Sequence, residues 1–255
     1  MSKMFYAKFG GSSFLAGFLA VALAACNGGG GESNSANSVS SRLDTVKNRG
    51  SLICGVNGQL PGFSFVNENG EYSGMDVDIC RAVASALFND PDKVEYRDLS
   101  AQERFTAVQS GEVDLLSRNT TWTISRDTSV GMEFAPTTFY DGQGIMVNQA
   151  SGIKNITDLR DKSICVAENT TSESNLRDRM DQLGISYKSL ALPNNQSLYN
   201  SYEYDLCQGI TGDISQLVVR KTLLANPQDH KILPTIISKE PLAPVLLNQD
   251  SQWFD

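Results

Sequence analysis

The feature that most constrains the fold is a repeated alternation of short apolar runs with amphipathic, helix-like segments. In the first half, this pattern predicts strands at 52–56, 93–96 and 113–116, with helices at 76–88 and from residue 100. In the second half, it predicts strands at 163–167, 186–192 and 206–211, followed by helices at 172–183, 196–204 and 214–224. Such alternation produces mostly parallel sheets covered by helices. Because the extended stretch 137–147 separates the halves, the sequence predicts two α/β lobes joined by a hinge.

Local signals mark where several of these helices begin. Ser100 and Glu103 have the spacing of a capping box, in which two side chains satisfy free backbone N–H groups of a helix start. Thr170 and Glu173 repeat this spacing before the helix at 172–183. Asp213 stands where its carboxylate can cap the helix at 214–224.

The N-terminal segment predicts export. Lys3 and Lys8 precede an apolar stretch at 14–25, which is too short to span a bilayer and has the pattern of a secretory signal within 1–25. Small residues before Cys26 resemble a bacterial lipobox, so we expect Cys26 to be lipidated; the alternative is an ordinary cleavage site beside a chance cysteine. The Gly/Ser/Asn-rich segment that follows predicts a flexible tether over 26–43.

The charge balance argues against nucleic acid as a partner. Without Lys3 and Lys8, the 21 basic residues become 19 against 29 acidic ones, which gives the mature chain a net charge of about −10. The chain also lacks the basic runs with which nucleic-acid-binding proteins contact phosphates.

Four cysteines remain besides the predicted lipidation site: Cys54, Cys80, Cys165 and Cys207. An even number in an exported protein predicts two disulfides. Three connectivities are possible, and pairing within each half of the chain is the simplest. The cysteine spacings do not match a zinc site, and the only histidine, His230, falls in a predicted loop, so we expect no metal.

A polar segment follows the strand predicted at 113–116. It carries five hydroxyl groups and the guanidinium groups of Arg118 and Arg126. Ligands of open α/β sheets bind beyond the carboxyl ends of the strands, and arginine forks two N–H bonds onto a carboxylate. The segment predicts a site for a small polar molecule; the alternative is a solvated turn.

Six segments match a known family in both order and spacing: Gly55–Phe65, Gly74–Val83, Glu103–Asp114, Leu116–Arg126, Tyr140–Gly144 and Ile237–Leu242. On these segments, the chain resembles the family 3 periplasmic solute-binding proteins, which are the amino-acid-binding components of ABC importers. The similarity is greatest to the branch that binds general or polar L-amino acids. It implies a two-lobe Venus-flytrap fold, with lobe 1 over 44–141 and 240–255 and lobe 2 over 142–239.

The resemblance also implies roles for individual residues. Arg126 matches the arginine that binds the α-carboxylate of the ligand, and Asn119 and Thr121 match positions that bond its carboxylate and ammonium. Thr171 matches a residue whose backbone N–H meets the same carboxylate at a helix N-terminus. Asp213 matches the carboxylate that receives the α-ammonium.

Residues that select the ligand side chain are less sharply defined. Arg104 resembles a position that meets side-chain carboxylates in proteins that bind acidic amino acids; the alternative is a solvated helix residue. Leu60 and Phe63 fall in a loop that lines the side-chain slot, and Trp122 is a candidate for its edge. Alternatively, these apolar groups pack the first loop.

The function implied is extracytoplasmic amino-acid capture. We expect a monomeric lipoprotein in the periplasm or on the outer face of the cytoplasmic membrane, without a cofactor, that delivers an L-amino acid to an ABC permease. The alternatives are a ligand-sensing receptor domain and a cyclohexadienyl dehydratase-like enzyme that uses Glu168 and Asp213. Family members continue beyond Asp255, so we also expect the chain to be a fragment that lacks part of lobe 1.

Overall fold

The computed structural model describes residues 41–129, 131–248 and 250–254, which belong to one compact unit. The predicted signal peptide, Cys26 and nearly all of the predicted tether lie outside these ranges. Helix α1 (Arg42–Arg49) begins inside the predicted tether, because the Ser41 side chain accepts a hydrogen bond of 3.1 Å from the Asp44 N–H at its start. The prediction that the tether extends to residue 43 was therefore wrong. Within the described ranges, none of the helices combines the length and apolar character that a membrane crossing requires.

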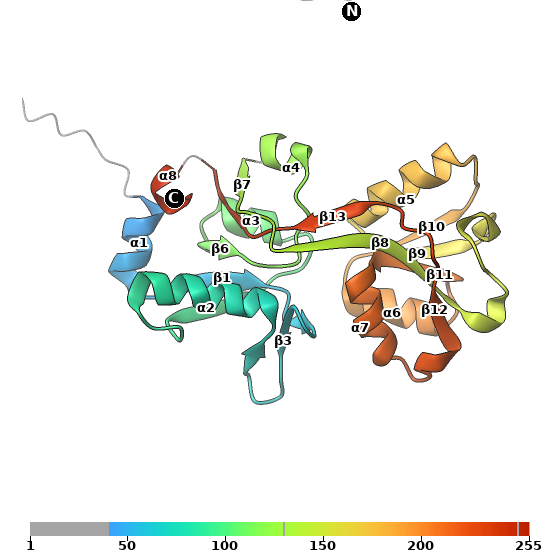
Figure 1. Ribbon diagram of the computed structural model, residues 1–255, viewed down its shortest axis with the longest axis horizontal. Helices are drawn as coiled ribbons and strands as arrows, with labels where there is room; N and C mark the ends of the chain where they lie inside the picture. Colours follow the sequence, from blue (N-terminus) through green and yellow to red (C-terminus); the bar gives the residue numbers. More distant parts are fainter. Residues whose placement is uncertain (1–40, 130, 249, 255) are drawn as a thin grey trace, which may run out of the picture. The chain divides into compact units, whose positions relative to one another are not determined.

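The first lobe is built on a five-stranded sheet with the order β5–β1–β6–β14–β7 (Figure 1). Its strands are β1 (Leu52–Val56), β5 (Val94–Asp98), β6 (Leu115–Leu116), β7 (Met132–Phe134) and β14 (Val245–Leu247). β1 pairs in parallel with β5 and β6, whereas β14, which returns from the second lobe, is antiparallel to β6 and β7. Four of the five strands run in the same direction, as the strand–helix alternation predicted, and β14 runs against them. A small antiparallel sheet beside it contains β2 (Gln59–Leu60), β3 (Ser64–Val66) and β4 (Tyr72–Ser73).

Helices cover both faces of the first sheet. Because successive residues of a strand point to opposite faces, Leu52 and Cys54 of β1 pack in one apolar cluster with α2 (Met75–Phe88), whereas Ile53 packs in another with α3 (Arg104–Gln109). Burial on both faces explains why the strands appear in the sequence as continuous apolar runs.

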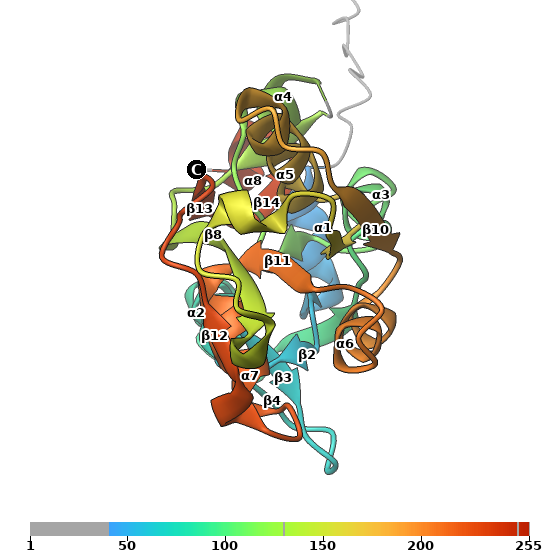
Figure 2. The ribbon, with the colours of Figure 1, turned by 90° about the vertical axis from the view of Figure 1, so that its right-hand side faces the viewer.

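The second lobe repeats this plan with the order β10–β9–β11–β8–β12. Its strands are β8 (Phe139–Asn148), β9 (Ser163–Ala167), β10 (Lys188–Leu192), β11 (Gly209–Asp213) and β12 (His230–Ile232). Ile145 and Val147 of β8 pack on the side of α5 (Thr171–Gln182), and Met146 packs on the side of α6 (Asn195–Glu203) and α7 (Ile214–Thr222). Figure 2 shows these helices around the sheet.

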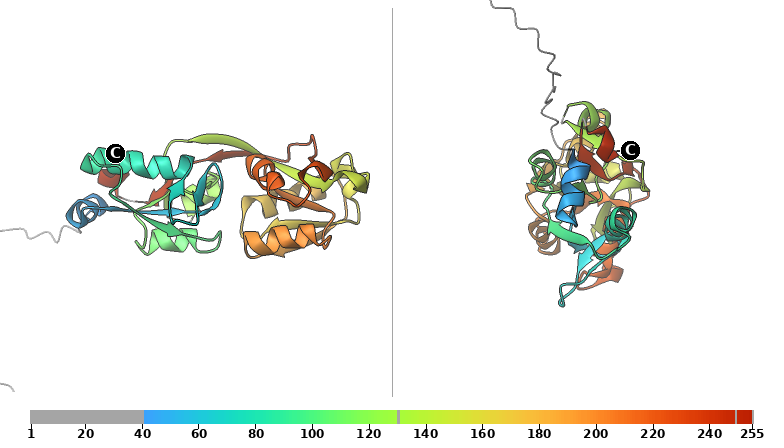
Figure 3. Two further views of the ribbon diagram at one scale, coloured as in Figure 1. Left: turned by 90° about the horizontal axis from the view of Figure 1, so that it is seen from below. Right: turned by 90° about the vertical axis from the view of Figure 1, so that its left-hand side faces the viewer.

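Two crossover strands connect the lobes. β8 is ten residues long, and its first four residues pair antiparallel with β13 (Lys239–Leu242), before the same strand continues into the second sheet. The register pairs Phe139 with Leu242 and Gly142 with Lys239. Figure 3 shows both strands running side by side from one lobe to the other. The extended connector predicted at 137–147 is thus the first of two paired crossovers.

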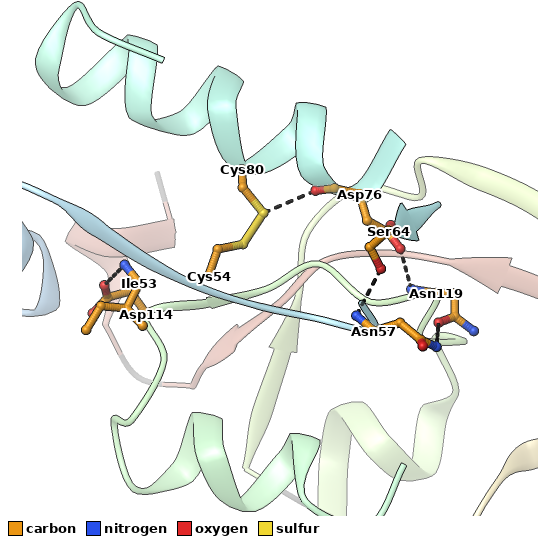
Figure 4. The surroundings of a disulfide bond; sticks show 8 residues. All are labelled: Ile53, Cys54, Asn57, Ser64, Asp76, Cys80, Asp114 and Asn119. Carbon is orange, nitrogen blue, oxygen red and sulfur yellow. Dashed lines mark hydrogen bonds between the residues drawn. A yellow bond between two sulfur atoms is a disulfide. The ribbon is translucent and has the colours of Figure 1, made fainter. Parts of the chain in front are cut away.

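Each lobe contains one disulfide, as the simplest connectivity predicted. Cys54 of β1 is bonded to Cys80 of α2, with the two Cα atoms 6.2 Å apart (Figure 4). Cys165 of β9 is bonded to Cys207, which precedes β11, with the two Cα atoms 5.7 Å apart. The bridges therefore fasten a helix to β1 and a loop to β9, which are interior strands of the two sheets.

Some predicted boundaries were wrong. The strand predicted at 206–211 lies at Gly209–Asp213, because Gly212 and Asp213 continue the ladder opposite Gly144 and Gln143 of β8. The spacing of apolar side chains did not reveal this extension, since the added residues are not apolar. The reciprocal hydrogen bonds predicted between Ser100 and Glu103 form, but the helix predicted from residue 100 begins only at Arg104. At Thr170 only half of the box forms, and Glu173 accepts instead from the Asn169 N–H.

A buried carboxylate attaches α1 to the first lobe. The Asp114 side chain is fully buried and accepts a hydrogen bond of 2.7 Å from the Ile53 N–H of β1. It also forms ion pairs with Arg49 and, at 3.4 Å, with Arg42 of α1. The contacts of α1 and of the interior strand β1 therefore depend on one charged group.

We expect Asp114→Asn to lower the free energy of unfolding by about 2–4 kcal/mol, because the buried partners lose the charge that they surround. Urea denaturation of the purified chain measures this. The matched control is Asp78→Asn, since Asp78 pairs with Arg81 on the surface; this change should cost less than about 0.5 kcal/mol. Equal effects of the two substitutions would contradict the assignment.

Candidate functional site

The structure brings six of the seven predicted ligand-binding residues together around one cavity between the lobes. Arg104, Asn119, Thr121 and Arg126 line it from the first lobe, and Thr171 and Asp213 line it from the second. These residues follow carboxyl ends of strands or occupy first turns of helices, which is where open α/β sheets bind ligands.

The first-lobe wall is a polar turn that follows β6. Asn119 adopts a positive φ of 26°, and its N–H donates a 3.0 Å hydrogen bond to the buried carboxylate of Asp76. Asn57 donates at 3.3 Å to the Asn119 side chain (Figure 4). Burial raises the pKa of Asp76 to about 6, although the Asn119 N–H and Arg118 oppose this rise. The Asp76 carboxylate of α2, the helix that carries the disulfide, therefore holds the turn in place through the Asn119 N–H.

Three guanidinium groups converge on this wall. Burial, followed by repulsion from Arg118 and Arg126, holds the pKa of Arg104 well below its usual range. Burial lowers the pKa of Arg118 to about 10, and it also lowers that of Arg126. The Arg104 side chain is only 3% exposed, so its alternative interpretation as a solvated helix residue was wrong. Concentrated, poorly hydrated positive charge of this kind attracts an anion.

Arg126 is held in a defined position. It lies in α4 (Ile124–Ser129), and its guanidinium donates a 2.7 Å hydrogen bond to the carbonyl oxygen of Thr121. Its charged carbon lies 5.2 Å from the centre of the Phe105 ring, which also contacts Arg104 at 4.8 Å. The ring therefore lies against both guanidinium groups.

Asp213 supplies negative charge from the second lobe. Burial raises its pKa to about 7, and the carboxylates of Asp141 and Glu240 add to this rise, whereas Arg104 opposes it. Asp213 occupies the N-cap position of α7, but its side chain accepts no hydrogen bond from a backbone N–H of that helix, so the expectation that it caps the helix was wrong. Its carboxylate instead accepts a 2.9 Å bond from Gln216 and lines the cavity. A buried carboxylate of this kind is stabilised by a cation.

Thr171 begins α5, one residue after the N-cap Thr170. At this position backbone N–H groups have no partner inside the helix, and the helix dipole favours an anion. The side chain of Thr171 reaches the first lobe, with its hydroxyl oxygen 3.4 Å from that of Thr121. Both lobes thus contribute hydroxyl groups to one place.

The sequence did not identify Glu240 of β13 as part of this region. Its side chain is 1% exposed and accepts hydrogen bonds from Thr121 at 2.6 Å and from Thr171 at 3.0 Å. The only hint in the sequence was the position of the Glu240 carboxylate directly before the apolar run 241–247. Its significance depends on the pairing of β13 with β8, which brings residues distant in sequence together.

The structure does not place Leu60 in the cavity. Leu60 is 1% exposed and packs with Phe63 and Leu242, so the alternative that these groups pack the first loop is correct. The reason is the small β2–β3–β4 sheet, in which Leu60 pairs with Ser64 and its side chain lies in the core. Trp122 is 39% exposed and is not among the lining residues either.

Direct contacts hold the two lobes together around the cavity. Gln102 of the first lobe donates a 2.7 Å hydrogen bond to Glu168 of the second, and Arg220 of α7 donates to the carbonyl oxygen of Gln59. The Glu168 carboxylate, which was named as a candidate catalytic group, thus accepts a hydrogen bond from the Gln102 side-chain amide. The side chain of His230, on β12, pairs at 2.8 Å with the Tyr202 hydroxyl away from the cavity lining.

The sequence was compared with known proteins. The family model described as bacterial extracellular solute-binding proteins, family 3, matches residues 52–239. The general L-amino acid-binding periplasmic protein AapJ of Rhizobium johnstonii is 47% identical over 84% of this chain. The glutamate/glutamine/aspartate/asparagine-binding protein BztA of Rhodobacter capsulatus is 44% identical over 84% of this chain. The chain spans 62% of the first relative and 64% of the second, which is less than two thirds of either.

A solved structure supports the same relationship. An ABC transporter periplasmic binding protein from Brucella ovis with glutathione bound has a TM-score of 0.81 and 48% identity, covering 84% of this chain and 67% of that protein. The family match extends from β1 to the start of β13 and therefore covers elements of both lobes and of both crossovers. The chain belongs to the bacterial extracellular solute-binding proteins of family 3.

Proposed function

We propose that this protein binds an L-amino acid between its two lobes and delivers it to the membrane subunits of an ABC importer. The observation that carries the proposal is the presence of opposite charges at one cavity, with the partly buried Arg126 on the first lobe and the buried Asp213 on the second. A zwitterion presents a carboxylate and an ammonium that match these two groups. Burying it costs little only when both of its charges find partners.

Each lobe holds one end of the ligand in this proposal. The α-carboxylate binds Arg126 and the N–H of Thr171 at the start of α5. The α-ammonium binds Asp213, the Thr121 hydroxyl oxygen and the polar turn at Asn119. Because these groups come from both lobes, the amino acid binds the closed arrangement better and shifts the population toward it. The permease then recognises the closed form.

The proposed ligand class includes acidic amino acids. Arg104 supplies a second guanidinium beside the α-carboxylate site, suited to a side-chain carboxylate. The Rhodobacter relative, whose name includes glutamate and aspartate, supports this choice. The predicted lipid anchor at Cys26, the periplasmic location or outer face of the cytoplasmic membrane, and the monomeric state complete the proposal. The residues before Cys26 support the anchor, and the Rhizobium relative, which is named as periplasmic, supports the location.

Calorimetric titration with L-glutamate, L-glutamine, L-leucine and L-arginine tests the function. We expect binding of at least one of these amino acids, and Arg126→Ala should weaken it by at least about 100-fold, because a buried charge pair loses one partner. The control is Arg81→Ala, since the Arg81 side chain is 40% exposed and should leave the affinity unchanged. Unchanged affinity of the Arg126 variant would overturn the assignment.

We expect affinity to fall with pH below about 7, because the ammonium binds the ionised form of Asp213, whose pKa burial raises to about 7. Below that pH the Asp213 carboxyl group must lose its proton before the ligand binds. Each further decrease of one pH unit therefore lowers the affinity by up to about tenfold. Titrations at pH 8, 7, 6 and 5 measure the slope. Asp213→Asn should weaken binding at pH 8 and flatten the profile. A wild-type profile that stays flat would contradict the proposal.

We expect Arg104→Met to raise the free energy of unfolding of the ligand-free protein by about 1–2 kcal/mol, because it removes a buried charge that two other arginines repel. The same variant should weaken binding of L-glutamate more than that of L-leucine. Urea denaturation and calorimetry measure the two effects. Arg97→Met, at a 44% exposed side chain, is the control and should change stability by less than about 0.5 kcal/mol. A less stable Arg104 variant would contradict the argument.

A further inference from the structure

The carboxylate of Glu240 lies behind the cavity wall and is fully engaged by hydrogen-bond donors. One of its oxygens, Oε2, accepts from the hydroxyl groups of Thr121 and Thr171. The other, Oε1, accepts from the amide of Asn175 at 2.8 Å and from the Ser238 hydroxyl. Glu240 itself does not line the cavity, whereas both threonines do. It therefore acts on a ligand only through the groups that it contacts.

These contacts fix the direction in which each threonine hydroxyl points. A hydroxyl has one hydrogen and two lone pairs. Because Thr121 and Thr171 both give their hydrogens to Glu240, the parts of these groups that remain for the cavity are lone pairs. The cavity wall at this point therefore accepts hydrogen bonds and does not donate them.

We propose that Glu240 is a positioning residue that makes the Thr121 hydroxyl an acceptor for the α-ammonium of the ligand. The inference rests on the proposed function, because it requires an amino acid in the cavity. An ammonium has three N–H donors and needs three acceptors, whereas a hydroxyl group in its place needs only one. Glu240 thus helps the site to prefer 2-amino acids over 2-hydroxy acids, although it touches neither.

The substitution Glu240→Gln reverses this arrangement. The Asn175 amide donates to Oε1, so the oxygen of the introduced glutamine must stay on that side. Its NH₂ group then faces Thr121 and Thr171, whose hydroxyls must accept from it and turn their own hydrogens toward the cavity. The size and shape of the side chain barely change, and the polarity of the wall inverts.

The test compares wild type with Glu240→Gln by calorimetry. The probes are whichever of L-glutamate, L-glutamine, L-leucine and L-arginine binds wild type most tightly, and the corresponding 2-hydroxy acid. We expect the variant to bind the amino acid at least about tenfold more weakly, because an ammonium loses an acceptor and meets a donor. Affinity for the hydroxy acid should stay within about threefold. Equal losses for both probes, or no loss, would overturn the proposal.

A double-mutant cycle separates positioning from the simple loss of negative charge. In a background that carries both Thr121→Val and Thr171→Val, neither hydroxyl is left to reorient, so Glu240→Gln should have no further effect on the preference for the amino acid. A charge effect on Arg126 or Asp213 would persist there, and its persistence would overturn the proposal. Thr121→Val alone should reproduce the selective loss, which keeps the test decisive if Glu240→Gln does not fold.

Two further comparisons complete the design. Glu112→Gln removes the same charge at an exposed position and should change neither affinity. A wild-type protein that binds none of the four amino acids would overturn the proposed function, and the inference with it. If the wild-type protein binds an amino acid and the Glu240→Gln variant keeps the same preference for the amino acid over the hydroxy acid, only the inference is overturned.

Discussion

The antiparallel pairing of β8 with β13 holds both crossovers at one place, and the arrangement of the site depends on it. β8 continues from this pair into the second sheet, and the chain after β13 returns to the first sheet as β14. The backbone of Thr121 is bridged to Leu242, and the Glu240 side chain reaches α5 of the second lobe. Residues from four distant parts of the sequence therefore meet where the lobes are joined.

The cavity concentrates buried charge that the ligand-free protein does not fully compensate. Burial shifts the pKa values of Arg104 and Asp213 in the directions that disfavour their charged forms. In the proposed function, a zwitterionic amino acid supplies the missing partner to each side. Affinity and stability are thus opposed at these positions, as is usual for groups that serve binding.

The parts of the fold carried by local patterns were predictable from the sequence. The apolar runs at Leu52–Val56 and Ser163–Ala167 coincide with strands, because side chains buried on both faces leave a continuous signal. Six residues of the candidate site were predictable because motif order fixes their place in the family fold. Leu60 and Glu240 were misjudged or missed, since their surroundings depend on strand pairings that no local pattern encodes.

The two disulfides determine where the molecule can deform. Each closes a loop inside one lobe, between Cys54 and Cys80 and between Cys165 and Cys207. Such crosslinks remove freedom from the chain that they enclose. Neither spans the crossovers, so each bridge constrains one lobe and places no covalent constraint across the β8–β13 pair. The angle between the two lobes is therefore left to non-covalent contacts, and it is the angle that the proposed capture of a solute would change.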